Sequence, residues 1–266
     1  MKIFRLRAYK IFLCSALCCA LSSCAGRSLQ PEPAVPIMQW EGKSPADVLH
    51  ALQEGQNRIT SLTAAFSLSV DPPPKGRPSN MQGILFVERS DPPRVRIKCL
   101  GPFGRIMFDM VSAGDDIQIY LPSKQTMYRG KADPDSQKKN VWKNVMESMF
   151  VNLAEAALPQ GASLSFMKNE VVLPLISGEL RLDRATGFIR QWQRADTTTT
   201  YDSYEAQAGL PPLPGRIRLR TSDNSLRAEF RMSQICANAP LENAFDLSGY
   251  TPKFVRSLDE LEKRSQ

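Results

Sequence analysis

The residue best placed for chemistry in this sequence is Cys24, at the end of the segment Leu21-Ser22-Ser23-Cys24. A leucine, two small residues and a cysteine at this distance from the start form a lipobox, where the thiol is acylated and the cysteine becomes the mature N-terminus. This pattern predicts covalent attachment of lipid at Cys24. The alternative is an ordinary secretory signal whose cleavage region holds a cysteine by chance.

The segment in front of Cys24 has the layout of a bacterial secretory signal. A basic start, from Lys2 to Lys10, precedes a short apolar run over residues 11–21. That run is about half the length that a membrane-spanning helix needs, so a retained transmembrane helix is not expected. We predict a lipoprotein signal peptide over residues 1–23, followed by the lipidated cysteine and a flexible, proline-bearing tether over residues 24–41.

Removal of the signal also changes the charge of the chain. The sequence has 34 basic and 27 acidic residues, and the signal holds four of the basic residues and none of the acidic ones. The mature part is therefore close to neutral. Its net charge gives no support to nucleic-acid binding.

Apart from Cys24, no group of residues predicts a reaction. His50 is the only histidine, and it falls in a predicted helix. The sequence has no Ser-His-Asp set, Cys-His pair, zinc-binding HExxH or glycine-rich phosphate loop. Alternating basic residues at Arg94–Lys98 and Arg216–Arg220 are typical of a solvated strand face. We therefore expect no enzyme activity, no metal site and no cofactor.

Two cysteines, Cys99 and Cys236, remain after Cys24 and the signal are set aside. Neither has a neighbouring cysteine or the spacing of a metal site. In an oxidising compartment they could form a disulfide. The alternative is a pair of free thiols in the core, because cysteine is often a small buried residue.

The elements begin with a helix. Ser44 is a good N-cap, Pro45 suits the first helical position, and Asp47 lies three residues after the cap. Apolar residues at helical spacing continue to Leu62. A second apolar-faced helix is predicted over Val141–Leu158.

Alternating apolar and polar residues predict short consecutive strands through most of the chain. The proline- and glycine-bearing segment 209–215 is predicted as a loop between two of them. Short turns between successive strands favour antiparallel pairing. Two helices cannot cover so wide a sheet unless it curls. We therefore predict a mostly β fold with two helices: a strongly curved antiparallel half-barrel of about eleven strands covered by helices. The predicted domain spans residues 42–237. A C-terminal extension over 238–266 is expected to add a strand or a short helix.

Three motifs in this order resemble the outer-membrane lipoprotein receptor family LolB, within the LolA/LolB-like superfamily. The first is the helix-to-strand junction Ile59–Phe66. The second is Arg94–Gly104, a strand followed by a Pro-apolar-Gly turn. The third is Leu210–Leu219 with the following strand, Leu226–Ile235. The loop over 130–140 and the C-terminal extension are longer than a minimal receptor needs, which argues against strict orthology.

The resemblance implies a half-barrel that takes lipoprotein acyl chains from a soluble LolA-type carrier and releases them into the outer membrane. It implies a monomer anchored by lipid on the periplasmic side, without nucleic acid. Ala25 and Gly26 lack the aspartate that retains lipoproteins in the inner membrane of enterobacteria, which favours the outer membrane.

Such a receptor needs an apolar cavity, because each methylene removed from water contributes about 0.8 kcal/mol. The same residues could instead pack a closed core, and the sequence leaves this choice open. The candidate lining residues are Phe66, Leu68, Ile84, Phe86, Val95, Ile97, Ile106, Phe108, Met110, Ile117, Ile119, Met146, Met149, Phe150, Phe230 and Met232.

The resemblance also assigns a role to Phe103. In the family, an apolar residue at this turn projects into solvent and helps to insert the cargo into the membrane. Phe103 stands where leucine is expected. The alternative is a phenylalanine folded back to plug the turn.

Two other classes of function are kept beside this one. The first is an envelope-assembly or structural lipoprotein that uses the same fold as a protein-binding module. The second is a periplasmic lipid or glycolipid carrier. Bound lipid on the purified domain would separate the binding classes from the structural one.

Overall fold

The computed structural model describes residues 39–71, 79–131, 153 and 156–263. The chain divides into two compact units, Met1–Pro36 and Ile37–Gln266. Every described element and every described core residue lies in the second unit, so a chain that begins after Cys24 keeps all of the described elements. Cys24, the signal and most of the tether lie outside the described residues, as does most of the predicted helix Val141–Leu158.

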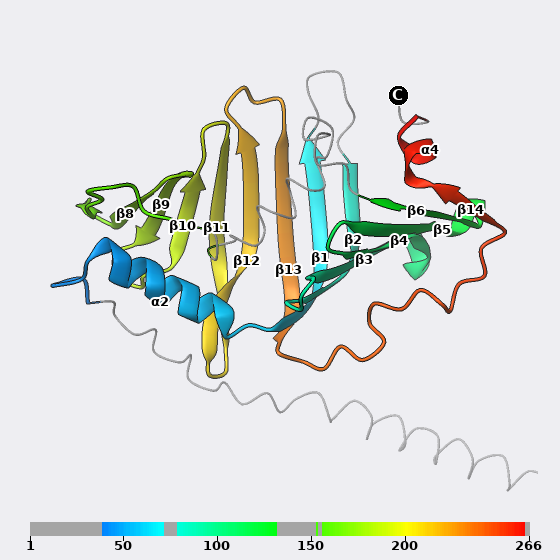
Figure 1. The fold of residues 1–266 in the computed structure, drawn as a ribbon, viewed down its shortest axis with the longest axis horizontal. Helices are drawn as coiled ribbons and strands as arrows, with labels where there is room; N and C mark the ends of the chain where they lie inside the picture. The colour runs from blue at the N-terminus through cyan, green and yellow to red at the C-terminus, as the bar shows by residue number, and fades with distance from the viewer. Residues whose placement is uncertain (1–38, 72–78, 132–152, 154–155, 264–266) are drawn as a thin grey trace, which may run out of the picture. The chain divides into compact units, whose positions relative to one another are not determined.

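The described elements are strands with few helices (Figure 1). In chain order they are α2 Pro45–Asn57, β1 Ser61–Asp71, β2 Ser79–Glu88, β3 Arg94–Leu100, the 3-10 turn η2 Pro102–Gly104, β4 Ile106–Ala113, β5 Asp116–Leu121, η3 Pro122–Lys124, β6 Thr126–Lys131, β7 Ser165–Phe166, β8 Glu170–Leu175, β9 Gly178–Asp183, β10 Ile189–Gln193, β11 Thr197–Gln207, β12 Leu210–Thr221, β13 Arg227–Ala237, β14 Phe254–Ser257 and α4 Leu258–Lys263.

One open sheet contains all fourteen described strands, in the order β14-β6-β5-β4-β3-β2-β1-β13-β12-β11-β10-β9-β8-β7. The prediction of a mostly β chain with an unclosed, largely antiparallel sheet is confirmed. The predicted number of about eleven strands and the purely antiparallel pairing were wrong. Strand β14 pairs in parallel with β6, because the C-terminal segment returns to the sheet edge by a long connection.

Helix α2 begins as its sequence predicts. The Ser44 hydroxyl accepts a hydrogen bond from the Asp47 backbone N–H, and the Asp47 carboxylate accepts one from the Ser44 N–H. This reciprocal cap satisfies two backbone donors that a helix start leaves unpaired. The helix ends at Asn57 and not near Leu62, because Leu62 already pairs with Val87 in the β1–β2 ladder.

The main core lies between α2 and one face of the sheet, here called the inner face. On β1 the inner residues are Leu62, Ala64, Phe66 and Leu68, all buried. The Phe66 ring stacks on Phe230 of β13 with centroids 5.1 Å apart. The period-two alternation seen in the sequence is therefore an alternation between core and outer face.

The outer face of β4–β6 is covered by the C-terminal segment, which the sequence did not predict. Val111, Tyr120 and Met127 form a second apolar cluster with Leu247. The ring of Tyr250 stacks on Tyr120 with centroids 4.3 Å apart. Residues 238–266 thus contribute both a strand and part of a core.

The proline-bearing segment 210–215 was predicted as a loop and belongs to β12 instead. Here β12 pairs with β11, through Leu213 with Glu205 and Pro214 with Tyr204, whereas its pairing with β13 starts only at Arg216. Proline lacks a backbone donor and therefore suits a stretch that is paired on one side.

Cys99 and Cys236 are both free, which corrects the disulfide alternative. They lie on β3 and β13, which are separated by β2 and β1. At about 4.8 Å per strand spacing, these strands are about 14 Å apart, well beyond disulfide reach.

We expect the two thiols to react very differently. Burial, together with the nearby Asp109 charge, raises the pKa of Cys99 to about 12, so this thiol stays protonated and sheltered at neutral pH. Cys236 is exposed. With a chain of residues 25–266, a thiol reagent should label one cysteine quickly in the native protein and two after unfolding. Rapid native labelling of both cysteines would contradict this arrangement.

Candidate functional site

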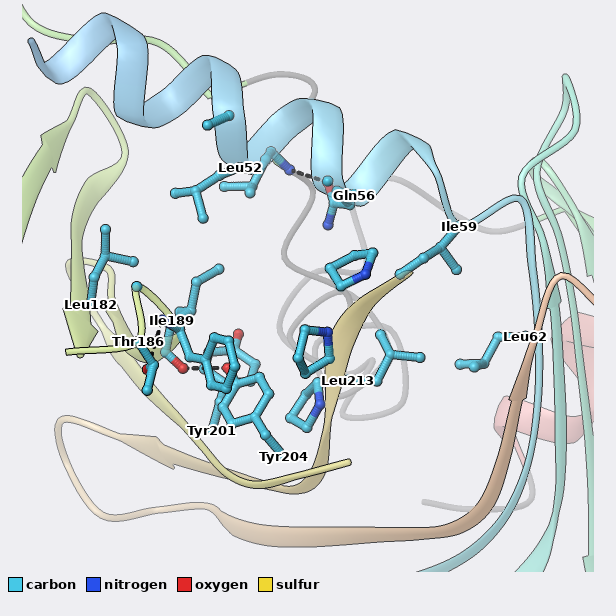
Figure 2. A pocket seen from close by; sticks show the side chains of 18 of the residues that line it. Leu52, Gln56, Ile59, Leu62, Leu182, Thr186, Ile189, Tyr201, Tyr204 and Leu213 are labelled. Carbon is cyan, nitrogen blue, oxygen red and sulfur yellow. Dashed lines mark hydrogen bonds between the residues drawn. The ribbon is translucent and has the colours of Figure 1, made fainter. Parts of the chain in front are cut away.

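A pocket of about 330 Å³ lies between α2 and the inner face of the sheet. Figure 2 shows Leu52 and Gln56 projecting from the helix toward Leu213, Tyr201 and Tyr204 on the strands. Figure 1 shows α2 across the β9–β12 side of the sheet. The lining residues are Trp40, Val48, Ala51, Leu52, Gly55, Gln56, Ile59, Thr60, Ser61, Leu62, Val87, Arg89, Leu153, Leu182, Thr186, Gly187, Phe188, Ile189, Tyr201, Tyr204 and Pro211–Pro214.

Hydrogen bonds hold α2 over the pocket at several points. The Gln53 amide donates to the Leu153 carbonyl at 2.8 Å, and the Leu153 N–H donates to the Gln56 side-chain oxygen at 3.1 Å. At the end of the helix, Arg89 donates to the Gln56 carbonyl at 2.7 Å. The Arg58 guanidinium donates to the Gly209 carbonyl in the β11–β12 turn. The helix is therefore tied to three segments that are far apart in the sequence.

The sheet side of the pocket is formed by aromatic rings and prolines. The rings of Phe188 and Tyr204 lie 4.7 Å apart, and the Tyr204 hydroxyl donates to the Ile189 carbonyl. Pro211 approaches Gly55 so closely that a side chain on Gly55 would touch it, with the Cβ at 3.9 Å from the proline ring. Because Gly55 has no side chain, it leaves space in the pocket.

The pocket is nearly free of charge. Burial raises the pKa of both Tyr201 and Tyr204, so their phenols are neutral at physiological pH. Arg89 is the one charged group among the described lining residues. Burial lowers its pKa, but a guanidinium stays protonated in proteins. This setting suits an apolar ligand better than a charged one.

None of the described lining residues is a carboxylate, histidine or cysteine. His50 lies on the exposed side of α2, 3.6 Å from Glu54. Among the described residues, no group of three or more His, Cys, Asp or Glu side chains could hold a metal ion, and no helix is long and apolar enough to cross a bilayer.

None of the described candidate lining residues predicted from the sequence lines this pocket. Phe66, Leu68, Ile97, Phe230 and Met232 are buried in the core, and Val95, Phe108 and Met110 pack against it. Ile106, Ile117 and Ile119 are half-buried. Met146, Met149 and Phe150 lie outside the described residues.

Ile84 and Phe86 lie on the outer face of the sheet, which corrects their assignment to the cavity. Ladder pairing places Ile84 opposite Lys98 and Phe86 opposite Arg96, whereas the core residue Leu85 between them faces the other way. The β2 strand is apolar on both faces, so its composition does not reveal which face is the inner one.

Phe103 occupies the tip of the turn between β3 and β4, with its side chain fully exposed. Its backbone has φ of 60°, a left-handed conformation that is rare for a bulky residue. Hydrogen bonds from Gly104 N to Gly101 O at 3.2 Å and from Gly101 N to Arg105 O at 2.7 Å close the turn. The ring projects into solvent, as the role predicted for it requires. The alternative, in which Phe103 folds back and plugs the turn, does not fit a fully exposed side chain.

Sequence reasoning missed the pocket because its parts are far apart along the chain. One usable signal was present: Val48, Leu52, Gly55, Gln56 and Ile59 share one face of the predicted helix. Part of the strand side of the pocket comes from Leu210–Gly215. Because this segment was predicted as a loop, the sequence did not indicate that it lines a pocket.

No known protein family's sequence profile matches this chain, and no curated protein matches it either. Its fold, however, matches solved structures. A DUF1329 family protein from Desulfovibrio piger superposes with a TM-score of 0.58 at 10% identity, covering 78% of this chain and 98% of its own. A LolA superfamily protein from Nitrosomonas europaea superposes with a TM-score of 0.51 at 11% identity, covering 77% and 98%.

This chain has a LolA-like fold. A lipoprotein-sorting protein domain from Vibrio parahaemolyticus is less similar, with a TM-score of 0.46 at 14% identity, covering 76% of this chain and 97% of its own. At these identities the likeness establishes the fold alone. In the LolA-like fold of this chain, α2 and the inner face of the sheet enclose the pocket described above.

Proposed function

We propose that this protein is an envelope lipoprotein, anchored to the outer membrane by lipid on Cys24, that binds acyl chains in the pocket under α2. In this role it receives lipoproteins from a soluble LolA-type carrier and helps to insert them into the membrane, without catalysing a reaction. The supporting observation is the apolar, almost uncharged pocket of about 330 Å³ in a LolA-like fold.

The physical basis of the proposal is the burial of hydrocarbon. An acyl chain gains about 0.8 kcal/mol for each methylene that leaves water, and the pocket offers aliphatic, aromatic and proline surfaces for it. The lipobox at Cys24 supports a location at a membrane. The exposed ring of Phe103 supports contact with that membrane.

Native mass spectrometry of residues 25–266 tests acyl binding directly. Copurified lipid or lipopeptide is expected on the protein, and the protein should bind a fluorescent fatty acid in solution. A protein that carries no lipid and binds no fluorescent fatty acid would contradict the proposal and favour the alternative of a protein-binding module.

The pocket itself is tested by Gly55→Leu. The new side chain would enter the pocket beside Pro211. Because overpacking costs about 1–3 kcal/mol, we expect fatty-acid binding to weaken about tenfold or more. Helix stability should not fall, because glycine is the poorer helix former. Gly55→Ala is the matched control, since it improves the helix but adds only one methyl group. Equal fatty-acid binding by the two variants would place the ligand elsewhere.

A further inference from the structure

The outer face of the β12–β13 hairpin carries five arginines, here called the arginine face: Arg216, Arg218, Arg220, Arg227 and Arg231. Strand alternation places them on the face away from the core residues Ile217, Leu219, Ala228 and Phe230. The ladder register puts Arg216 opposite Arg231 and Arg220 opposite Arg227. Like charges directly opposite each other destabilise a sheet.

Ion pairs with carboxylates occupy one end of the arginine face. Arg216 and Arg218 both bind Asp202, at 2.5 and 2.7 Å, and Arg231 pairs with Glu229. At the other end, Arg220 donates to the neutral amide of Asn224. Within the described part of the chain, no ion pair joins Arg220 or Arg227 to a carboxylate. Both side chains are exposed.

The end with Arg220 and Arg227 is the end of the sheet toward which the Phe103 turn extends. Strand β1 ends at Asp71, which pairs with Arg227 next to the β12–β13 turn. The ladders place Leu100, the last residue of β3, opposite Gln82 of β2, which pairs with Ser67 and so lies level with Arg231. Strand β3 runs in the same direction as β1, so the Phe103 turn that follows Leu100 extends toward the β12–β13 turn. From β13 to β3 the lateral distance is three strand spacings, about 14 Å.

A shallow groove runs along this face and is lined by polar side chains. Four arginines line it (Arg218, Arg220, Arg227 and Arg231), with the polar residues Ser67, Ser69, Asn80 and Gln82 of β1 and β2 and the two carboxylates of Asp71 and Glu229. Guanidinium groups bind phosphates through paired hydrogen bonds, and hydroxyl and amide groups can add further ones. The exposed Phe103 ring adds an apolar contact. A ligand surface that matches both features has phosphate groups above an apolar layer.

We propose that the arginine face, together with the Phe103 turn, forms a docking surface for a membrane rich in anionic phospholipid. Arg220 and Arg227 bind lipid phosphates while the Phe103 ring enters the apolar layer. The inference goes beyond the proposed function, since it concerns the surface on which the protein rests and needs no ligand in the pocket.

Vesicle flotation with residues 25–266 tests this inference. Vesicles of equal parts phosphatidylglycerol and phosphatidylcholine should bind the protein, vesicles of phosphatidylcholine alone should bind it weakly, and salt should weaken the difference. The double variant Arg220→Gln/Arg227→Gln should lose about ten- to thirtyfold in binding to the anionic vesicles.

Two control variants separate charge position from charge number and from folding. Lys43→Gln/Lys168→Gln removes the same charge from exposed residues away from the hairpin and should bind as the parent does. Arg220→Lys/Arg227→Lys keeps the charge and should retain most of the binding. Equal binding to both vesicle types, or undiminished binding by the glutamine variant, would overturn the inference. So would binding to polyglutamate but not to vesicles, because it would assign the face to an acidic protein.

Discussion

Replacing Asp109 with alanine is expected to destabilise the folded protein by about 3–5 kcal/mol. The Asp109 side chain is completely buried, and Arg96, which binds it through two nitrogens at 2.8 and 2.6 Å, is 8% exposed. Removing the carboxylate would leave the Arg96 guanidinium buried without its partner. That loss is far larger than the loss of a surface ion pair.

The same carboxylate connects the sheet to the C-terminal segment. The Tyr250 hydroxyl donates to Asp109 at 2.6 Å, and Arg96 also donates to the Ala244 carbonyl at 2.6 Å. Burial and the bond to Asp109 raise the pKa of Tyr250 to about 12, so its proton stays in place at physiological pH. Loss of Asp109 should therefore release residues 244–250 from the outer face as well as lower global stability.

Urea unfolding of the variants, with proteolysis of the C-terminal segment as a second readout, measures this effect. Tyr250→Phe is the graded control, because it removes one hydrogen bond and should cost about 1 kcal/mol. The double variant Arg96→Met/Asp109→Leu should recover much of the loss, since it leaves no buried charge. If the free energy of unfolding of Asp109→Ala were within about 1 kcal/mol of that of the parent, the buried Arg96–Asp109 pair would not hold residues 244–250 on the sheet.

Replacing Phe103 with glutamate is expected to abolish delivery of lipoproteins to membranes and to leave the fold intact. The side chain is fully exposed, so nothing in the core is lost. A carboxylate at the tip of the turn would be repelled by anionic headgroups and would not enter the apolar layer. The measurement is transfer from a LolA-type carrier to outer-membrane vesicles, with thermal unfolding as the test of folding.

Phe103→Leu is the matched control for this experiment. Leucine keeps an apolar tip, and because leucine and phenylalanine are both unbranched at Cβ, they meet a similar backbone cost at φ of 60°. Transfer should therefore persist in the leucine variant and disappear in the glutamate variant. Unchanged transfer with glutamate at this position would remove Phe103 from the proposed function.

Local features of this fold were predictable because they depend on neighbouring residues. Ser44 and Asp47 specify the start of α2 through contacts three residues apart. Alternation over Arg94–Leu100 specifies a strand with one apolar side, and the structure confirms it. The tail was expected to add a strand or a short helix, and it adds both β14 and α4.

Long-range features were not predictable in this way. The disulfide alternative failed because Cys99 and Cys236 are separated by two intervening strands, an order that pairing between distant segments determines. Ile84 and Phe86 were placed in the cavity because β2 is apolar on both faces, and only its register with β3 shows which face is inner. Residues 210–215 needed β11 as a partner to become a strand.

By itself the sequence predicted a lipobox at Cys24, and it determined the start of α2, the run of short strands and the apolar turn at Phe103, because each depends on residues within a few positions of one another. Only the tertiary structure decided where the pocket lies and which charges remain unpaired. The pocket forms where α2 meets the β11–β12 hairpin, and the exposed charge of Arg220 and Arg227 depends on the register of β12 with β13. Both result from packing between distant segments, which composition and spacing do not specify.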